Sequence, residues 1–198
     1  MTSLNHKIQQ ILEQIKQLED ELAEELHQQE QTITFKLKGK QVKFEKNIKQ
    51  LHRKLKTGVW RWLFRVHPLN LITAPIIYSM IIPLVFVDLL VSLYQASCFP
   101  IYKISKVKRS DYIVFDRHHL AYLNIFERWH CLYCSYANGL IAYCHEILAR
   151  TEQYFCPIKH AHKALGTHTR YRNFLTYGDA DNYHARRESL REQLSREK

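Results

Sequence analysis

The stretch VHPLNLITAPIIYSMIIPLVFV, residues 66–87, contains no Asp, Glu, Lys or Arg, and it decides the fold class. After Asp88 the chain again carries no charged residue until Lys103. An uncharged, mostly apolar run of about 20 residues is typical of a bilayer-embedded segment, because a helix of that length crosses the ~30 Å hydrocarbon core. The sequence therefore predicts a membrane-embedded segment over residues 59–102. The alternative is a buried helix of a soluble core, where so long an uncharged run is unusual.

Pro83 and Asp88 interrupt this segment, so its path through the bilayer is a separate question. The arms Leu69–Ile82 and Leu84–Phe99 would each be roughly 21–24 Å long as helices, which is shorter than the ~30 Å core. Both flanks of the segment are rich in Lys and Arg, which concentrate on the cytoplasmic side of membranes. We predict a re-entrant hairpin bent at Pro83 with both flanks in the cytoplasm. A single tilted span is the alternative.

The chain that leads into this segment is basic and aromatic. Residues 36–65 hold eleven Lys or Arg residues and one acid, and this block requires an anionic partner. Tryptophan and basic side chains gather at the headgroup level of a bilayer, which predicts a membrane interface with anionic lipid formed by Trp60, Arg61, Trp62 and Arg65. The same interleaving could stack on RNA bases, but the apolar run that follows makes nucleic acid the less favoured partner.

Two further elements are predicted at the N-terminus. Residues 1–30 are expected to form a coiled-coil-like helix, because apolar residues recur at steps of three and four among Glu, Gln and Lys. These residues are Leu4, Ile8, Ile11, Ile15, Leu18, Leu22 and Leu26. Residues 4–26 would bind a second copy or a partner helix, or would dock on the chain's own domain. Residues 31–58 are expected to form a small β-hairpin with a lysine-rich face and then a basic amphipathic helix.

The C-terminal region, residues 103–198, is rich in cysteine and histidine. Asp116 is placed to cap a helix that ends near His130, and a second helix is predicted from about Gly139 until Pro157 stops it. Joined at CLYCSYANG, the two helices are expected to form an antiparallel αα-hairpin. The fold class that follows is mainly α-helical and membrane-associated.

Ligand-type residues in this region predict a metal site. Cys131-x-x-Cys134 and Cys156-x-x-x-His160 together match a Cys3His zinc sphere. A helix between the two pairs separates them by roughly 25 Å, whereas ligands lie about 2.3 Å from zinc. The hairpin would instead bring the second pair to the start of the first helix and leave the first pair at the opposite end. The predicted site is a Cys/His/Asp cluster suited to zinc or iron, with candidate ligands Asp116, His118, His119, Cys156 and His160, and at the other end Cys131 and Cys134.

Other roles for these groups stay open. The CxxC pair would be a redox-active dithiol in a thioredoxin-like domain, whose βαβ pattern is missing here. Cys156 would be a nucleophile if one of the two adjacent histidines acted as its base. Glu127 and His130 have the spacing of a di-iron helix, but in a single copy. Cys144 lies in the middle of an apolar stripe and is expected to be a small core residue.

The chain has a formal net charge of +10, 46% apolar residues and only five glycines, which argues against disorder and against a turn-rich β protein. Its Gln- and Glu-rich N-terminus does not resemble a secretory signal, so the five cysteines are expected to be thiols or metal ligands in a reducing compartment. The leading hypothesis is a membrane-anchored cytosolic protein that binds zinc or iron in a structural or redox role. The alternatives are a non-enzymatic membrane adaptor, and a membrane enzyme acting on a lipid or quinone-like substrate.

The segments DRHHLAYLN, CLYCSYANG, ARTEQYFCPIKHA and YGDADNYHA resemble an uncharacterised family of small bacterial membrane-associated proteins. The likeness covers most of the chain from about residue 60 onward. It implies a bacterial inner-membrane setting, and it implies no activity and no catalytic residue.

Overall fold

The computed structural model describes residues 2–31, 35–38, 41–44, 50, 52–56, 58, 59, 61, 64 and 67–197. Of the predicted membrane-interface residues, Trp60, Trp62 and Arg65 lie outside this set, and Arg61 is exposed. The chain divides into two compact units, one formed by residues 1–56 with 119–122 and the other by residues 57–118 with 123–198.

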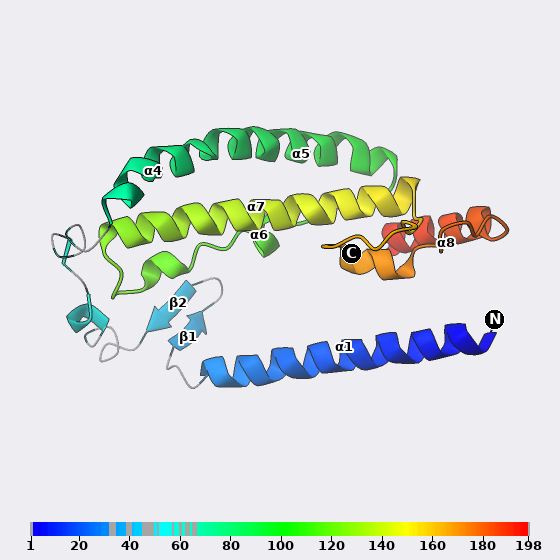
Figure 1. The fold of residues 1–198 in the computed structure, drawn as a ribbon, viewed down its shortest axis with the longest axis horizontal. Helices are drawn as coiled ribbons and strands as arrows, with labels where there is room; N and C mark the ends of the chain where they lie inside the picture. The colour runs from blue at the N-terminus through cyan, green and yellow to red at the C-terminus, as the bar shows by residue number, and fades with distance from the viewer. Residues whose placement is uncertain are drawn as a thin grey trace. The chain divides into compact units, whose positions relative to one another are not determined.

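The first unit contains a long helix and a two-stranded ribbon (Figure 1). Helix α1 spans Thr2–Gln31, the region in which apolar residues recur at steps of three and four. Strands β1 (Phe35–Lys38) and β2 (Gln41–Phe44) pair antiparallel, with Phe35 opposite Phe44. The basic helix expected after the ribbon falls largely on residues outside the described set.

The second unit begins with an apolar segment made of two consecutive helices. Helix α4 (Pro68–Ser79) has a proline in its first turn, and the side chain of His67 accepts a hydrogen bond from the backbone N–H of Leu69. Helix α5 (Ile81–Ile101) follows after the single residue Met80. In the described part of the chain, this 34-residue segment is the one helix that is long and apolar enough to cross a membrane.

The predicted re-entrant hairpin bent at Pro83 is wrong. Helix α5 runs through Pro83, and α4 and α5 form one arched rod that does not turn back on itself (Figure 1). Pro83 is the third residue of α5. The N–H groups of the first four helical residues have no partner within the helix, so the missing N–H of a proline costs little there.

A single helix, α7 (Ile125–Phe155), replaces the predicted αα-hairpin. The side chain of Asn124 accepts a hydrogen bond from the N–H of Glu127, and the Glu127 carboxylate accepts one from the N–H of Asn124. This capping box starts the helix, whereas the predicted cap, Asp116, precedes only a 3-10 turn at Arg117–His119. The predicted loop CLYCSYANG is helical throughout.

Gly139, which was expected to lie in a connection, lies inside this helix where another segment approaches it closely. A Cβ atom at this position would lie 2.6 Å from the backbone oxygen of Tyr112 and 2.9 Å from the Cα of Ile113. Both residues belong to the connector, which we define as residues 102–118 and which contains the short helix α6 (Arg109–Tyr112). The glycine therefore serves the close approach of the connector to α7.

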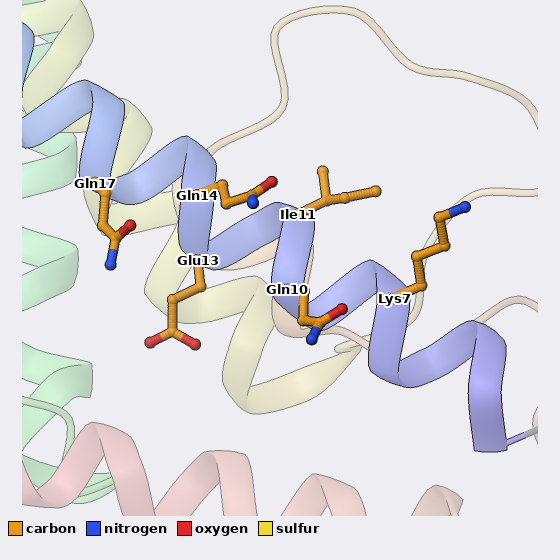
Figure 2. A pocket seen from close by; sticks show the side chains of 6 residues that line it. All are labelled: Lys7, Gln10, Ile11, Glu13, Gln14 and Gln17. Carbon is orange, nitrogen blue, oxygen red and sulfur yellow. The ribbon is translucent and has the colours of Figure 1, made fainter.

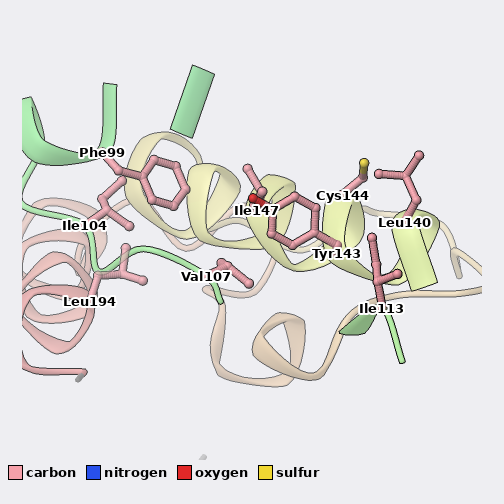
Figure 3. Packing of buried hydrophobic residues seen from close by; sticks show 9 residues of the cluster. All are labelled: Phe99, Ile104, Val107, Ile113, Leu140, Tyr143, Cys144, Ile147 and Leu194. Atoms are coloured by element: carbon pink, nitrogen blue, oxygen red, sulfur yellow. The ribbon is translucent and has the colours of Figure 1, made fainter. Parts of the chain in front are cut away.

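Helices α5 and α7 run side by side in the same direction, and the core lies between them and the connector (Figures 1 and 3). Phe99 of α5 and Ile147 of α7 are fully buried there. Among the described residues, the buried members of this cluster are Phe99, Ile104, Val107, Ile113, Leu140, Tyr143, Cys144, Ile147 and Leu194. Residues of α5, the connector and α7 make up most of this core, and Leu194 near the C-terminus completes it.

The chain after α7 folds back against the C-terminal end of that helix. Ile158 and Leu175 form an isolated parallel bridge, and a 3-10 helix, η2, spans Thr169–Asn173. The last helix, α8 (Tyr183–Arg196), buries Leu190 and Leu194. A second apolar cluster of Phe174, Leu175 and Leu190 holds this region together.

Candidate functional site

The structure separates the predicted metal ligands along α7. Cys134 lies on the helix and Cys156 is its C-cap, 22 positions later, which places the two cysteines about 33 Å apart. His118 precedes Ile125 by seven positions, a stretch of chain that reaches at most about 24 Å. Cys156 lies roughly 46 Å from Ile125, so His118 and Cys156 are about 20 Å or more apart.

The predicted cluster of Asp116, His118, His119, Cys156 and His160 is therefore not assembled. Within the described ranges, no group of three His, Cys, Asp or Glu side chains is arranged to hold a metal ion. The cluster depended on a reversal of the chain at residues 131–139, and that reversal does not occur. Metal binding by any of these residues stays a prediction.

The five cysteines are free thiols. Cys144 is buried in the core, as predicted, and burial raises the pKa of its thiol. A buried, protonated thiol behaves as a small apolar side chain, so Cys144 contributes to packing. Cys134 and Cys156 are exposed, at distant positions of the same helix.

Polar side chains meet instead along the contact between α5 and α7, which we call the polar seam. Asp88 accepts hydrogen bonds from Arg109 Nη2 at 2.6 Å and from the Tyr136 hydroxyl at 2.9 Å. The Nε of Arg109 donates to the second oxygen of Asp88 at 3.3 Å. The Asp88 side chain is 13% exposed and that of Arg109 is 47% exposed. Asp88 is the single acidic residue of residues 66–102, and it forms an ion pair with Arg109 of the connector.

Gln95 and Tyr94 continue the polar seam along α5. The Gln95 side-chain oxygen accepts from the N–H of Val107 at 2.6 Å, and its amide nitrogen donates to the Tyr143 hydroxyl at 3.0 Å. The hydroxyl of Tyr94 lies 2.8 Å from that of Thr151. Hydrogen bonds between helices are typical of packing in lipid, where apolar side chains gain little by leaving the acyl chains.

Helix α5 is inverted relative to a surface helix of a soluble domain. Its inward side carries the polar residues Asp88, Ser92 and Gln95, whereas such helices normally turn polar residues outward. The exposed side of α4 and α5, the outer face, carries no charged residue and is mostly apolar, with a few small polar residues such as Thr73 and Ser97. Its large apolar residues are Leu69, Leu71, Ile72, Ile76, Ile77, Met80, Ile82, Val85, Phe86, Val87, Leu89, Leu90, Leu93 and Ile101. Apolar surfaces of this extent mark protein or membrane contacts.

The C-terminal end of α7 carries a network of ion pairs. Arg170 binds Glu146 at 2.7 Å and Glu197 at 2.6 Å, and Arg150 binds Glu146 at 2.8 Å. Burial would raise the pKa of Glu146, but hydrogen bonds from Arg170 and Arg150 outweigh burial and hold this pKa below its ordinary value. The network links the end of the chain to α7.

Two cavities adjoin α7. One of about 230 Å³ is lined by Tyr78, Ile81, Trp129, Leu132, Tyr133 and Tyr136 and is largely aromatic. The other, of about 210 Å³, lies near the helix end and includes His145, Glu152 and His168 in its wall. His168 accepts from the N–H of Tyr171 through Nδ1 and pairs with Glu152 through Nε2 at 2.9 Å. Both ring nitrogens of His168 therefore serve the fold.

A third depression lies on α1 alone. Figure 2 shows its six lining side chains, which include Lys7, Ile11 and Gln17, rising from one helix and pointing in different directions. Side chains of a single helix cannot enclose a small molecule, since ligand pockets bury most of the ligand surface.

The fold and the polar seam define a mainly helical protein with one helix, among the described residues, of sufficient length and apolarity to cross a membrane. No protein-family model, curated protein or solved structure matches the chain. Sequence reasoning missed the polar seam. Asp88, Ser92 and Gln95 are spaced i, i+4 and i+7, which places them on one helical face, and this spacing is the signal that could have found it.

Proposed function

We propose that the protein is a non-enzymatic membrane adaptor that attaches to an anionic bilayer through the outer face of α4 and α5. The observation that carries this proposal is the inversion of α5, whose buried side is more polar than its exposed side. Leu89 and Leu93 are each 65% exposed, whereas Gln95 is 7% exposed. In water this arrangement exposes apolar surface at a cost of about 25 cal/mol per Å², and in lipid that cost disappears.

Charge supports an anionic lipid as the partner. The connector carries the exposed Lys103, Lys106 and Lys108 in addition to Arg109, whose charge is paired with Asp88. The chain before α4 adds the basic block of residues 36–65. Each Lys or Arg near an anionic surface contributes about 1 kcal/mol of attraction, so several of them strengthen the attachment that the outer face begins.

The adaptor role rests on α1. Its apolar stripe is exposed at the positions that the structure describes, with Leu18 at 64%, Leu22 at 60% and Leu26 at 51%. The spacing of these leucines is that of a helix–helix seam, which a second copy or a partner helix would cover. The membrane attachment and the recruiting helix would thus be carried by different parts of one chain.

Fractionation of cells that express the full chain tests the membrane attachment. The variant Leu89→Asp/Leu93→Asp places two charges on the outer face, and each costs about 3 kcal/mol in hydrocarbon, so we expect at least a roughly tenfold smaller share in carbonate-washed membranes. The matched control is Leu165→Asp/Tyr177→Asp, which alters exposed residues outside α4 and α5 (89% and 66% exposed). Circular dichroism checks that both variants fold. Equal retention of the variant and the wild-type chain, or a soluble wild-type chain, would contradict the proposal.

A further inference from the structure

We propose that α4 and α5 lie in the plane of one leaflet, with the outer face in the acyl region, and do not cross the bilayer. This inference rests on the proposed membrane attachment and names its geometry. A 34-residue helical segment is about 51 Å long, and a span of the ~30 Å hydrocarbon core uses only about 20 residues. Every window of 20 residues within Pro68–Ile101 contains Tyr78 or Asp88. The neighbours of these two residues decide whether a span is possible.

Around Asp88, the neighbour is the connector. Arg109 binds Asp88 at 2.6 Å, and the backbone of Val107 binds Gln95, so residues 107–109 lie beside the second half of α5. Lys106, Lys108 and Arg109 are exposed there, and residues 104–108 are not helical. Irregular backbone and exposed charges are not tolerated against acyl chains. A span that contained Asp88 would place both in the hydrocarbon.

Around Tyr78, the neighbour is the start of α7. The Tyr78 ring contacts Trp129 and stacks on His130, with ring centroids 6.5 and 5.7 Å apart. Glu127 and Arg128 lie within one turn of these residues, directly after the irregular residues at Asn124. A span centred on Tyr78 would carry this charged helix start toward the bilayer centre, where an Arg alone costs about 3 kcal/mol.

An in-plane segment avoids both conflicts. The outer face enters the leaflet by roughly 5–10 Å, as interfacial helices do, while the connector and α7 lie on its other side. The occupant that fits is lipid, because the outer face has no charged residue and the exposed cations of the connector complement anionic headgroups. A second copy would cover the same face without using those cations.

Labelling of lysines in the native chain tests this geometry. Spheroplasts and inverted inner-membrane vesicles from a bacterial host that expresses the full chain are treated with a membrane-impermeant amine reagent, and labelled lysines are located by mass spectrometry. Lys54 and Lys56 precede the segment, and Lys103, Lys106 and Lys108 follow it. We expect both groups to be labelled from the same side and to be protected from the other side. Detergent-permeabilised vesicles show that every lysine can react.

Labelling of the two groups from opposite sides would overturn the in-plane geometry and leave the membrane attachment intact. Recovery of the chain in the soluble fraction, as a monomer or as a dimer that covers the outer face, would overturn the attachment and with it this inference. The two failures are distinguished by the fraction in which the chain is found before any labelling.

Discussion

The guanidinium of Arg109 and the carboxylate of Asp88 are 2.6 Å apart, and they join the connector to the middle of an otherwise uncharged helical segment. Tyr136 of α7 binds the same carboxylate at 2.9 Å. One acidic side chain therefore ties α5, the connector and α7 together. A carboxylate that is 13% exposed needs such partners, since an unpaired buried charge is strongly destabilising.

Arg109→Ala should lower the free energy of unfolding by about 1–2 kcal/mol, because it leaves the Asp88 carboxylate without its charged partner. Asp88→Ala/Arg109→Ala should cost less than the sum of the two single variants, with a coupling of about 1 kcal/mol. Denaturant titration in mild detergent measures these values. Arg117→Ala, at an exposed position, is the control for the loss of an arginine. Strict additivity would show that the pair contributes nothing.

Gly139→Ala should destabilise the protein by about 1–3 kcal/mol, because the added Cβ would lie 2.6 Å from the Tyr112 oxygen. Without the close contact, alanine would stabilise a helix by about 1 kcal/mol over glycine. A loss of stability in Gly139→Ala would therefore point to the contact with the connector. Thermal unfolding measures the stability. Gly58→Ala, outside a helix, is the control for a glycine whose Cβ position is open, since no described atom lies within 4 Å of a Cβ there. A more stable Gly139→Ala variant would mean that the connector does not pack against α7.

Acid should weaken the ion-pair network at the end of α7. The pKa of Glu146 lies below the ordinary value of 4.5, because hydrogen bonds from Arg170 and Arg150 outweigh the effect of burial. The stabilisation is therefore complete above about pH 5 and is lost as the pH falls through the lowered pKa. Glu146→Gln should be less stable at pH 7 by about 1–2 kcal/mol and should lose less stability between pH 6 and pH 3.

Urea unfolding at a series of pH values measures this difference, and Glu188→Gln, at a position whose side chain is 58% exposed, is the control. Parallel pH profiles for the wild-type chain and Glu146→Gln would show that Glu146 carries no pH-dependent stability.

Two lysines on the apolar stripe of α1 should prevent helix–helix association. Leu18→Lys/Leu22→Lys places charges at seam positions, where they would be buried between helices. Gln10→Lys/Gln17→Lys adds the same charge away from the stripe and should associate as the wild-type chain does. Chemical cross-linking and sedimentation in mild detergent report the oligomeric state. If the wild-type chain is a monomer, or if its association does not involve α1, self-association through α1 would be excluded. A partner helix would then be the remaining role of α1.

Metal analysis tests the separation of the predicted ligands. Because His118 and Cys156 are about 20 Å or more apart, His118→Ala and Cys156→Ala should not remove the same ion. Elemental analysis of the protein purified in mild detergent measures zinc and iron per chain. One equivalent of metal that is lost in both variants, but kept in Cys144→Ala, would show that the two residues share a site after all.

The apolar segment and the mainly helical fold could be predicted from the sequence, because composition and period are local properties. The apolar character of residues 66–87 is a matter of composition and does not depend on any other part of the chain. The apolar stripe of α1 likewise follows from the spacing of its leucine and isoleucine residues alone. The predicted cluster of Cys and His residues failed for a different reason. It required the chain to turn between Cys131 and Gly139, and nothing local distinguishes a glycine in a turn from a glycine against a neighbouring segment.

What the sequence by itself determined is where charge is absent and where apolar residues repeat. Only the tertiary structure decided which side of α5 faces inward, since Asp88 and Gln95 find their partners in residues far along the chain, at Arg109, Val107, Tyr136 and Tyr143. It also decided that residues 125–155 form one helix, with Gly139 in its interior packed against the connector. The spacing of Asp88, Ser92 and Gln95 places them on one helical face, but which residues they contact depends on packing in three dimensions.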